Sequence, residues 1–284
     1  MPGVRPPLGR LLLRPGVAAV RRDPDTLQVG LTPPHAVRLR DVEPVRDLLA
    51  ELRAGLVPAG LHEEADRALA ALVDAGLAVP CDGRPDTPGL RVAQAQFGAD
   101  GARRLACRSA HGVGVRADGA TREVATELLT AAGLRVDDAT PAVWLVASPG
   151  PLAREGLDDL QRSGVPHVVV AGELGSRRVG PFVEPGRTAC LRCVDAHEAE
   201  SDPRRPFLVE QAARASGPTE PHDPVLDRLA LAWATRDVLR YLEGDEPSTW
   251  SATVDIGPVA PPTVTRWLRH HHCGCAWDLL LQEA

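Results

Sequence analysis

The sequence predicts an α/β protein of two domains: a winged-helix-like domain of three strands plus helices, then a Rossmann-like domain built on a parallel sheet. Three β-prone runs followed by two amphipathic helices in residues 1–85 have the element order of a winged helix. From residue 104 to 284, apolar strands alternate with helices, as in a parallel sheet with right-handed crossovers. Two pairs of closely spaced cysteines in this second part predict a structural zinc site. Residues 86–103 are expected to be a linker.

Three short strands are expected near the N-terminus, at Val17–Arg21, Leu27–Leu31 and His35–Arg40. The first two flank the turn-rich residues Asp23-Pro24-Asp25, which is a hairpin signal. The third alternates apolar and polar residues after two prolines. These runs predict a small antiparallel sheet.

Two helices are expected to follow these strands. Asp41 is placed to cap the first, which ends near Gly55. The second runs from Leu61 to Ala75 and ends at Gly76. Each has apolar residues at helical spacing, and these predict the buried faces: Val45, Leu48, Leu49 and Leu52, then Ala65, Leu69, Leu72 and Val73.

The predicted linker is rich in residues that interrupt regular structure. Prolines and glycines cluster before it and at its start, at Pro80, Gly83, Pro85, Pro88 and Gly89. Such a cluster indicates a linker or the wing of the first domain.

The second domain begins with alternating strands and helices. A helix through Val124, Leu128 and Leu129 should end at Gly133, and another is expected at Leu152–Ser163. The expected strands are apolar runs, the later ones uniformly so, as buried parallel strands should be: Gly112–Arg116, Leu134–Val136, Val143–Ala147 and Val165–Ala171.

The loop after the first of these strands is where a Rossmann-type sheet would hold a nucleotide. Two glycines of the run Gly112–Gly119 lie inside the strand, and only Gly119 falls in the turn. Asp118 would direct a negative charge at a phosphate. The loop therefore predicts a weak or lost nucleotide site.

The end of the chain is expected to complete the domain. Residues 204–223 are polar and proline-containing, which indicates a crossover loop. A helix at Pro224–Leu242 and a closing pair of strands at Thr249–Ile256 and Thr263–Leu268 should follow.

The cysteine pairs are the most specific signal. Cys190 and Cys193 form one pair and Cys273 and Cys275 the other, so that two turns present four thiolates to one tetrahedral ion. Disulfides and a redox pair are alternatives, but the sequence has no secretory signal, and redox Cys-x-x-Cys motifs stand alone. His272 could replace one ligand. The other two cysteines, Cys81 and Cys107, are expected to be ordinary buried thiols.

Composition limits the possible functions. All 32 basic residues are arginines, so a P-loop lysine, a Schiff-base lysine and a lysine general base are excluded. The net charge is −6 and aromatic residues are only 3% of the chain, which argues against a nucleic-acid partner. No run is long enough to span a membrane. We therefore expect a cytoplasmic protein with no membrane contact.

The segment that carries the zinc prediction also carries a resemblance. The run Val179–Cys193, then Asp202-Pro203 and His272–Cys275, resembles the ThiF-like family, which is related to ubiquitin-activating enzymes. More narrowly, it resembles the ocin-type, cyclodehydratase-associated branch found in biosynthesis of ribosomally made, modified peptides. The first 80 or so residues resemble, in element order, a PqqD-like precursor-peptide recognition element.

The family's adenylation site has a glycine-rich loop, an acid after the second strand, arginine and lysine contacts to phosphates, and a magnesium-binding aspartate. Here lysine is absent, and Ser148–Pro151 offers no acid for magnesium. Gly119 and Arg154 are the remnants that could contact ATP, and Asp137 or Asp138 could stand for the earlier acid. These departures from the family's site argue against ATP and magnesium binding and favour a non-catalytic role over an adenylyltransferase.

What the ocin-type branch implies is leader-peptide binding and delivery to a separate YcaO-type cyclodehydratase. In such recognition elements the leader adds as a strand along the third strand and packs against the last helix. The implied contacts lie on that edge and helix: Val37, Arg38, Leu39, Arg40, Arg67 and Leu69. Solvated edge charges are the alternative for the two edge arginines, Arg38 and Arg40. A homodimer is expected by analogy. The runner-up is an ATP-dependent adenylyltransferase acting on a peptide or carrier-protein carboxylate, and a DNA-binding regulator is third.

Overall fold

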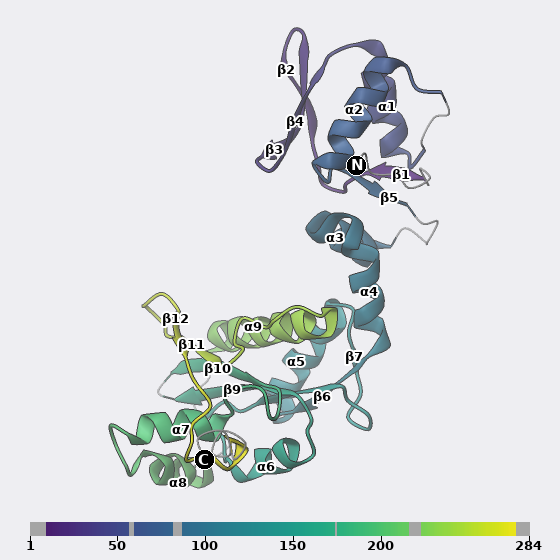
Figure 1. Ribbon diagram of the computed structural model, residues 1–284. Coiled ribbons are helices and arrows are strands. Elements are labelled where there is room, and N and C mark those ends of the chain that lie inside the picture. Colours follow the sequence, from purple (N-terminus) through teal and green to yellow (C-terminus); the bar gives the residue numbers. More distant parts are fainter. Residues whose placement is uncertain (1–9, 57–59, 82–86, 174, 216–222, 277–284) are drawn as a thin grey trace, which may run out of the picture. The chain divides into compact units, whose positions relative to one another are not determined.

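The computed structural model describes residues 10–56, 60–81, 87–173, 175–215 and 223–276 (Figure 1). The chain folds into two compact units, Met1–Ala106 and Cys107–Ala284. The first unit holds a small antiparallel sheet with helices, and the second is a mixed α/β unit with a seven-stranded sheet. Among the described residues, no helix is both long and apolar enough to cross a membrane.

The sheet of the first unit confirms the three predicted strands. Its strands are antiparallel in the order β2-β3-β4. Strand β4 pairs with β3 alone among the described strands, so its other edge faces no strand. The bounds are β2 Ala19–Asp23, β3 Thr26–Thr32 and β4 His35–Arg40.

Two helices pack their apolar faces into the core of this unit, and a short strand pair closes it. Strands β1 and β5 pair antiparallel, and the sequence pattern did not predict this pair. Val73 was placed on the buried face of the second helix, but its side chain is 43% exposed, because helical spacing turns it toward solvent next to buried Leu72. The bounds are β1 Leu11–Leu13, α1 Glu43–Arg53, α2 Glu63–Asp74 and β5 Ala78–Pro80.

Asp41 does not cap α1. The N-cap is Val42, which makes no side-chain cap hydrogen bond. The Asp41 carboxylate instead accepts from Arg21 at 2.9 Å and from Arg46 at 2.5 Å. Two hydrogen bonds from guanidinium groups engage this carboxylate, and together they outweigh the single backbone hydrogen bond of an N-cap.

The predicted linker contains regular structure. Thr87 caps a helix by accepting from the backbone N–H of Leu90. Pro88 lies in the first turn of this helix, where a backbone N–H would have no partner within the helix, so proline is tolerated there. The prolines and glycines that indicated a linker thus partly mark the start of a helix. The bounds are α3 Pro88–Phe97, η1 Gly98–Asp100 and α4 Gly101–Ala110.

The second unit is built on a sheet in the order β12-β11-β10-β9-β8-β6-β7. Strands β6 to β9 are parallel, as predicted, but β10, β11 and β12 are antiparallel to their neighbours, so the sheet is mixed. Only two residues separate β9 from β10, and such a short connection forces a hairpin. The bounds are β6 Gly112–Arg116, β7 Arg135–Val136, β8 Val143–Ala147, β9 His167–Glu173, β10 Ser176–Val183, β11 Ala252–Ile256 and β12 Thr263–Arg266.

Helices cover both faces of this sheet (Figure 1). The side chains of α5 and α9 join the larger core on one face, and those of α6 and α7 pack on the other. Residues 204–223 were expected to form a loop, but α8 occupies most of that segment; residues 216–222 of the expected loop lie outside the described residues. The bounds are α5 Gly119–Ala131, α6 Glu155–Arg162, α7 Leu191–Ala199, α8 Arg205–Ala215, α9 Pro224–Glu243 and η2 Gly274–Ala276.

Candidate functional site

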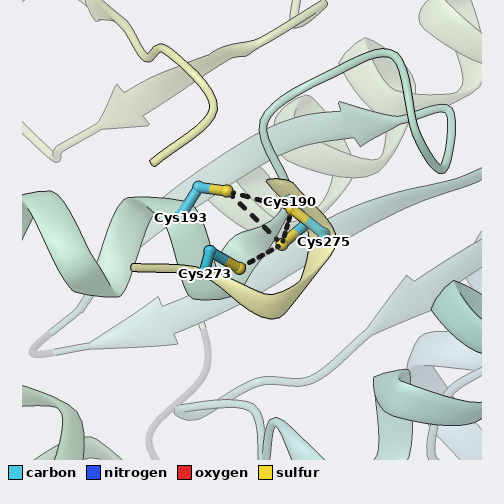
Figure 2. A group of neighbouring side chains, drawn as sticks. All are labelled: Cys190, Cys193, Cys273 and Cys275. Carbon is cyan, nitrogen blue, oxygen red and sulfur yellow. Dashed lines mark hydrogen bonds between the residues drawn. The ribbon is translucent and has the colours of Figure 1, made fainter. Parts of the chain in front are cut away.

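The structure brings the four predicted cysteine ligands together (Figure 2). Cys190 is the N-cap of α7, and Cys193 lies in the first turn of that helix. Cys273 and Cys275 come from the turn around η2, more than eighty residues later. The site therefore ties the start of α7 to the C-terminal segment.

The sulfur positions suit one tetrahedral ion. The Sγ atom of Cys190 lies 3.7 Å from Cys193, 3.6 Å from Cys273 and 3.5 Å from Cys275, and Cys193 lies 3.3 Å from Cys275. Four sulfurs bound to zinc at about 2.3 Å would be about 3.8 Å apart, whereas a disulfide needs about 2.0 Å. All four cysteines are free. Spacing and donor type therefore fit a zinc ion and no disulfide.

The surroundings of the sulfurs suit a closed structural site. Cys190, Cys193 and Cys273 are buried against Val183, with Trp267 packed beside them. Four sulfurs fill a tetrahedral shell and leave no position for a substrate. The cluster is therefore suited to holding segments together and not to a reaction.

The residues around the cysteines differ in part from what the sequence predicted. His272 is not one of the clustered ligands; its backbone N–H donates to the ring of His270. Trp277, which the sequence places beside the second cysteine pair, lies outside the described residues. Trp267 does pack against the cysteines, and its indole N–H donates to Thr253 at 3.0 Å.

The position where a nucleotide would bind lies where the strand order reverses, between the carboxyl ends of β6 and β8. There Asp118 caps helix α5, and its carboxylate accepts from the backbone N–H of Thr121 at 2.9 Å. A donor that would attract a phosphate is thus already bound to an acid of the chain itself. Gly119 follows in the first turn with open space around its α-carbon.

The glycines of β6 serve packing. A Cβ atom at Gly114 would lie 2.5 Å from the ring of Trp144, and one at Gly112 would lie 2.7 Å from the side chain of Asp137. Arg116 at the end of the strand stacks on Trp144 and pairs with Asp159 at 3.1 Å. Close strand and ring packing therefore accounts for both glycines without a nucleotide.

The arginine expected to contact ATP has a partner. Arg154 makes a bidentate ion pair with Asp195, at 2.8 and 2.7 Å, and both side chains are largely buried. It borders a cavity of about 140 Å³ near the carboxyl ends of β8 and β9. Arg178, on the same cavity, was not among the predicted residues; its ion pairs with Asp255 and Glu198, at 2.7 Å each, keep its pKa raised despite burial. The sequence signal that could have identified Arg178 is a charged side chain within an otherwise apolar run.

The predicted peptide contacts divide into three pairs. Leu39 and Leu69 are core side chains, 7% and 3% exposed, so they cannot touch a peptide directly. Arg38 is exposed on the free-edge strand β4 and Val37 half-buried. The remaining two pair with α2 acids, Arg40 with Glu64 at 2.8 Å and Arg67 with Glu63 and Glu64 at 3.3 Å.

No protein-family model and no curated protein matches this sequence. Solved structures do match its fold. A heterocyclase in complex with substrate and cofactor aligns with a TM-score of 0.70 at 16% identity, over 93% of this chain and 39% of that one. The heterocyclase TruD aligns with a TM-score of 0.68 at 14% identity, over 94% and 42%. This chain thus spans about two fifths of the length of these heterocyclases.

Escherichia coli MccB matches over a larger share of its own length. Its structure with succinimide aligns with a TM-score of 0.63 at 12% identity, over 94% of this chain and 99% of MccB. MccB has also been solved with ATP and with SeMet MccA. At these identities the likeness establishes a shared fold.

Proposed function

We propose that this protein is a zinc-containing, non-catalytic scaffold that binds the leader of a ribosomally made precursor peptide. It presents that peptide to a separate cyclodehydratase of the YcaO type. Two observations support the proposal. The cysteine-containing segment resembles the ocin-type ThiF-like branch, and this chain shares its fold with part of two solved heterocyclase structures.

The observation that carries the non-catalytic role is the hydrogen bond from Thr121 to Asp118 at the start of α5. It holds a carboxylate at the start of α5, and repulsion between this anion and a phosphate at the same helix end would disfavour nucleotide binding. Arg116 and Arg154 are held by acids, at 3.1 Å from Asp159 and 2.7 Å from Asp195. No lysine exists to replace them.

The two heterocyclases are longer than this chain. The two heterocyclases extend over more than twice the part that aligns with this chain. The rest of such a heterocyclase has no counterpart in these 284 residues. In our proposal that part comes from outside these residues, and the zinc-bearing unit serves as its docking platform.

Strand β4 supports the peptide-binding role. Its free edge can donate and accept backbone hydrogen bonds along an added strand. Arg38 is exposed on that strand, Arg40 of the same strand pairs with Glu64 of α2, and Arg67 belongs to α2 itself. An extended leader with acidic side chains would be complementary to this edge.

The first test is calorimetric titration of the zinc-loaded protein with MgATP. The proposal predicts no binding, which a second method such as equilibrium dialysis should reproduce. Micromolar binding would instead favour the adenylyltransferase function over the scaffold.

The second test uses peptides selected from a display library for binding to the protein. Arg38→Glu should lower the affinity for acidic peptides by about two- to fivefold, which corresponds to the loss of an exposed ion pair. Arg22→Glu on β2, at the opposite edge of the same sheet, is the matched control and should leave affinity unchanged. Equal effects of the two variants would remove β4 as the binding edge.

One observation favours the runner-up. MccB aligns over 99% of its length and has been solved with ATP. An adenylyltransferase acting on a peptide or carrier-protein carboxylate is therefore the second candidate. It would need Asp118 to leave its helix cap, so Asp118→Asn should increase MgATP affinity if this candidate is correct.

A further inference from the structure

A second group of potential metal ligands lies beside the cysteine cluster. His197 and Glu200 stand at the end of α7, four and seven residues after Cys193, and His270 comes from the segment before Cys273. One carboxylate oxygen of Glu200 lies 3.5 Å from Nδ1 of His197 and 3.1 Å from Nε2 of His270. One ligand atom from each residue lies within 4.8 Å of the others.

The ring of His197 is oriented as a ligand. Its Nε2 lies 3.0 Å from the backbone carbonyl of Leu268, which can only accept, so Nε2 carries the proton in the neutral ring. The lone pair is therefore on Nδ1, the atom that faces Glu200. A backbone carbonyl that fixes the far nitrogen is the usual support of a metal-binding histidine.

His270 is buried, with 5% of its surface exposed. Its Nδ1 accepts the backbone N–H of His272 at 3.1 Å, so in the metal-free protein Nε2 donates its proton to Glu200. Coordination through Nε2 moves that proton to Nδ1 and breaks the bond from His272. This cost makes an ion here more exchangeable than one held by four thiolates.

The charge and spacing of the group fit a cation. In the part of the chain that the structure describes, the Glu200 carboxylate pairs with these two imidazoles and with no guanidinium. Ligand atoms about 2.0 Å from a tetrahedral ion lie about 3.3 Å apart, close to the two measured separations. Glu200 is 65% exposed, so water has access to a remaining position.

We propose that His197, Glu200 and His270 form a second divalent-metal site, which takes a borderline ion such as Zn²⁺, Co²⁺ or Ni²⁺. Two imidazoles and one carboxylate suit these ions. Unlike the four-cysteine site, it has an open coordination position. The inference is independent of the proposed peptide-binding function.

The test counts metal ions bound by the full chain. Protein is loaded with Zn²⁺, dialysed with and without a chelator, and its metal content is measured by mass spectrometry. Wild-type protein should retain one ion in the chelator and bind a second reversibly. Glu200→Gln and His197→Ala should each lower the affinity for the second ion by about tenfold or more and leave the first ion bound.

Two further variants make the result specific. His271→Ala, in the same histidine run but outside the cluster, should keep both ions; Cys190→Ser should lose the tightly held ion. With Co²⁺, the thiolate-to-metal absorption should be unchanged in Glu200→Gln. The proposal is wrong if wild-type protein binds a single ion, if Glu200→Gln binds two as tightly as wild type, or if only His271→Ala loses the second ion. Should His197→Ala disturb the neighbouring cysteine site, Glu200→Gln alone decides.

Discussion

Cys190 and Cys273 are separated by 83 positions in sequence, yet their Sγ atoms lie 3.6 Å apart. The contact joins the N-cap of α7 to the last described turn of the chain, which follows the last described strand, β12. A metal ion at this point would close a long loop of the second unit. Its binding free energy would then be part of the folding free energy of that unit.

Cys190→Ser should release zinc and lower the stability of the second unit. A hydroxyl replaces a thiolate at the centre of the cluster, so three sulfurs remain where four are needed. Metal analysis and thermal unfolding measure the two effects. Cys81→Ser, at a free cysteine of the first unit, is the control and should leave zinc content unchanged. Undiminished zinc in Cys190→Ser would refute the site.

Asp118→Ala should destabilise the second unit by about 0.5–2 kcal/mol, the usual cost of losing an N-cap. The carboxylate accepts from Thr121 and caps α5, which packs into the main core through Ala125 and Leu129. Urea unfolding measures the change. Asp118→Asn keeps a side-chain oxygen that can cap the helix, so its loss of stability should be much smaller. An Asp118→Ala variant as stable as wild type would show that the cap is unimportant.

The elements that the sequence predicted best include β4, through its alternating pattern, and two uniformly buried strands. β6 and β8 match their predicted bounds residue for residue, because buried parallel strands are apolar on both faces. The clustering of the four cysteines was also predictable, since close cysteine spacing needs no knowledge of the fold. Both signals are local in sequence.

The elements that were missed depend on contacts far along the chain. β10 contains Gly180 and Pro181, which argue against a strand, and its Arg178 is tolerated only because Asp255 and Glu198 neutralise it. α8 buries none of its residues and so shows no apolar stripe. Helical spacing placed Leu69 on the buried face of α2, as observed, whereas the peptide contact expected there came from the family resemblance and not from the helical pattern.

Asp237→Ala should destabilise the second unit by about 3 kcal/mol or more. Its fully buried carboxylate accepts four hydrogen bonds, from the backbone N–H and hydroxyl groups of Ser248 and Thr249, at 2.5 to 2.9 Å. Removing it leaves buried donors unpaired, at about 1–3 kcal/mol each. Chemical denaturation measures the loss. Glu123→Ala, an exposed acid on α5, is the control and should change stability by less than about 0.5 kcal/mol.

Asp137 should titrate well below the ordinary aspartate range. The hydrogen bond from Arg135, at 2.6 Å, and those from the backbone N–H groups of Thr140 and Ala139 lower its pKa from 3.8 to about 2. Because the folded-state pKa is the lower one, the carboxylate stabilises the fold above about pH 4, and this contribution is lost as the pH falls toward about 2.

Carboxyl NMR of the folded-state signals measures this pKa directly. Arg135→Gln should raise the midpoint of Asp137 toward 3.8, because its largest cause of lowering is removed. Arg122→Gln is the matched control: Arg122 pairs with Asp138, so its loss should leave the Asp137 midpoint near 2. A wild-type midpoint close to 3.8 would mean that the Arg135 pair does not persist in solution.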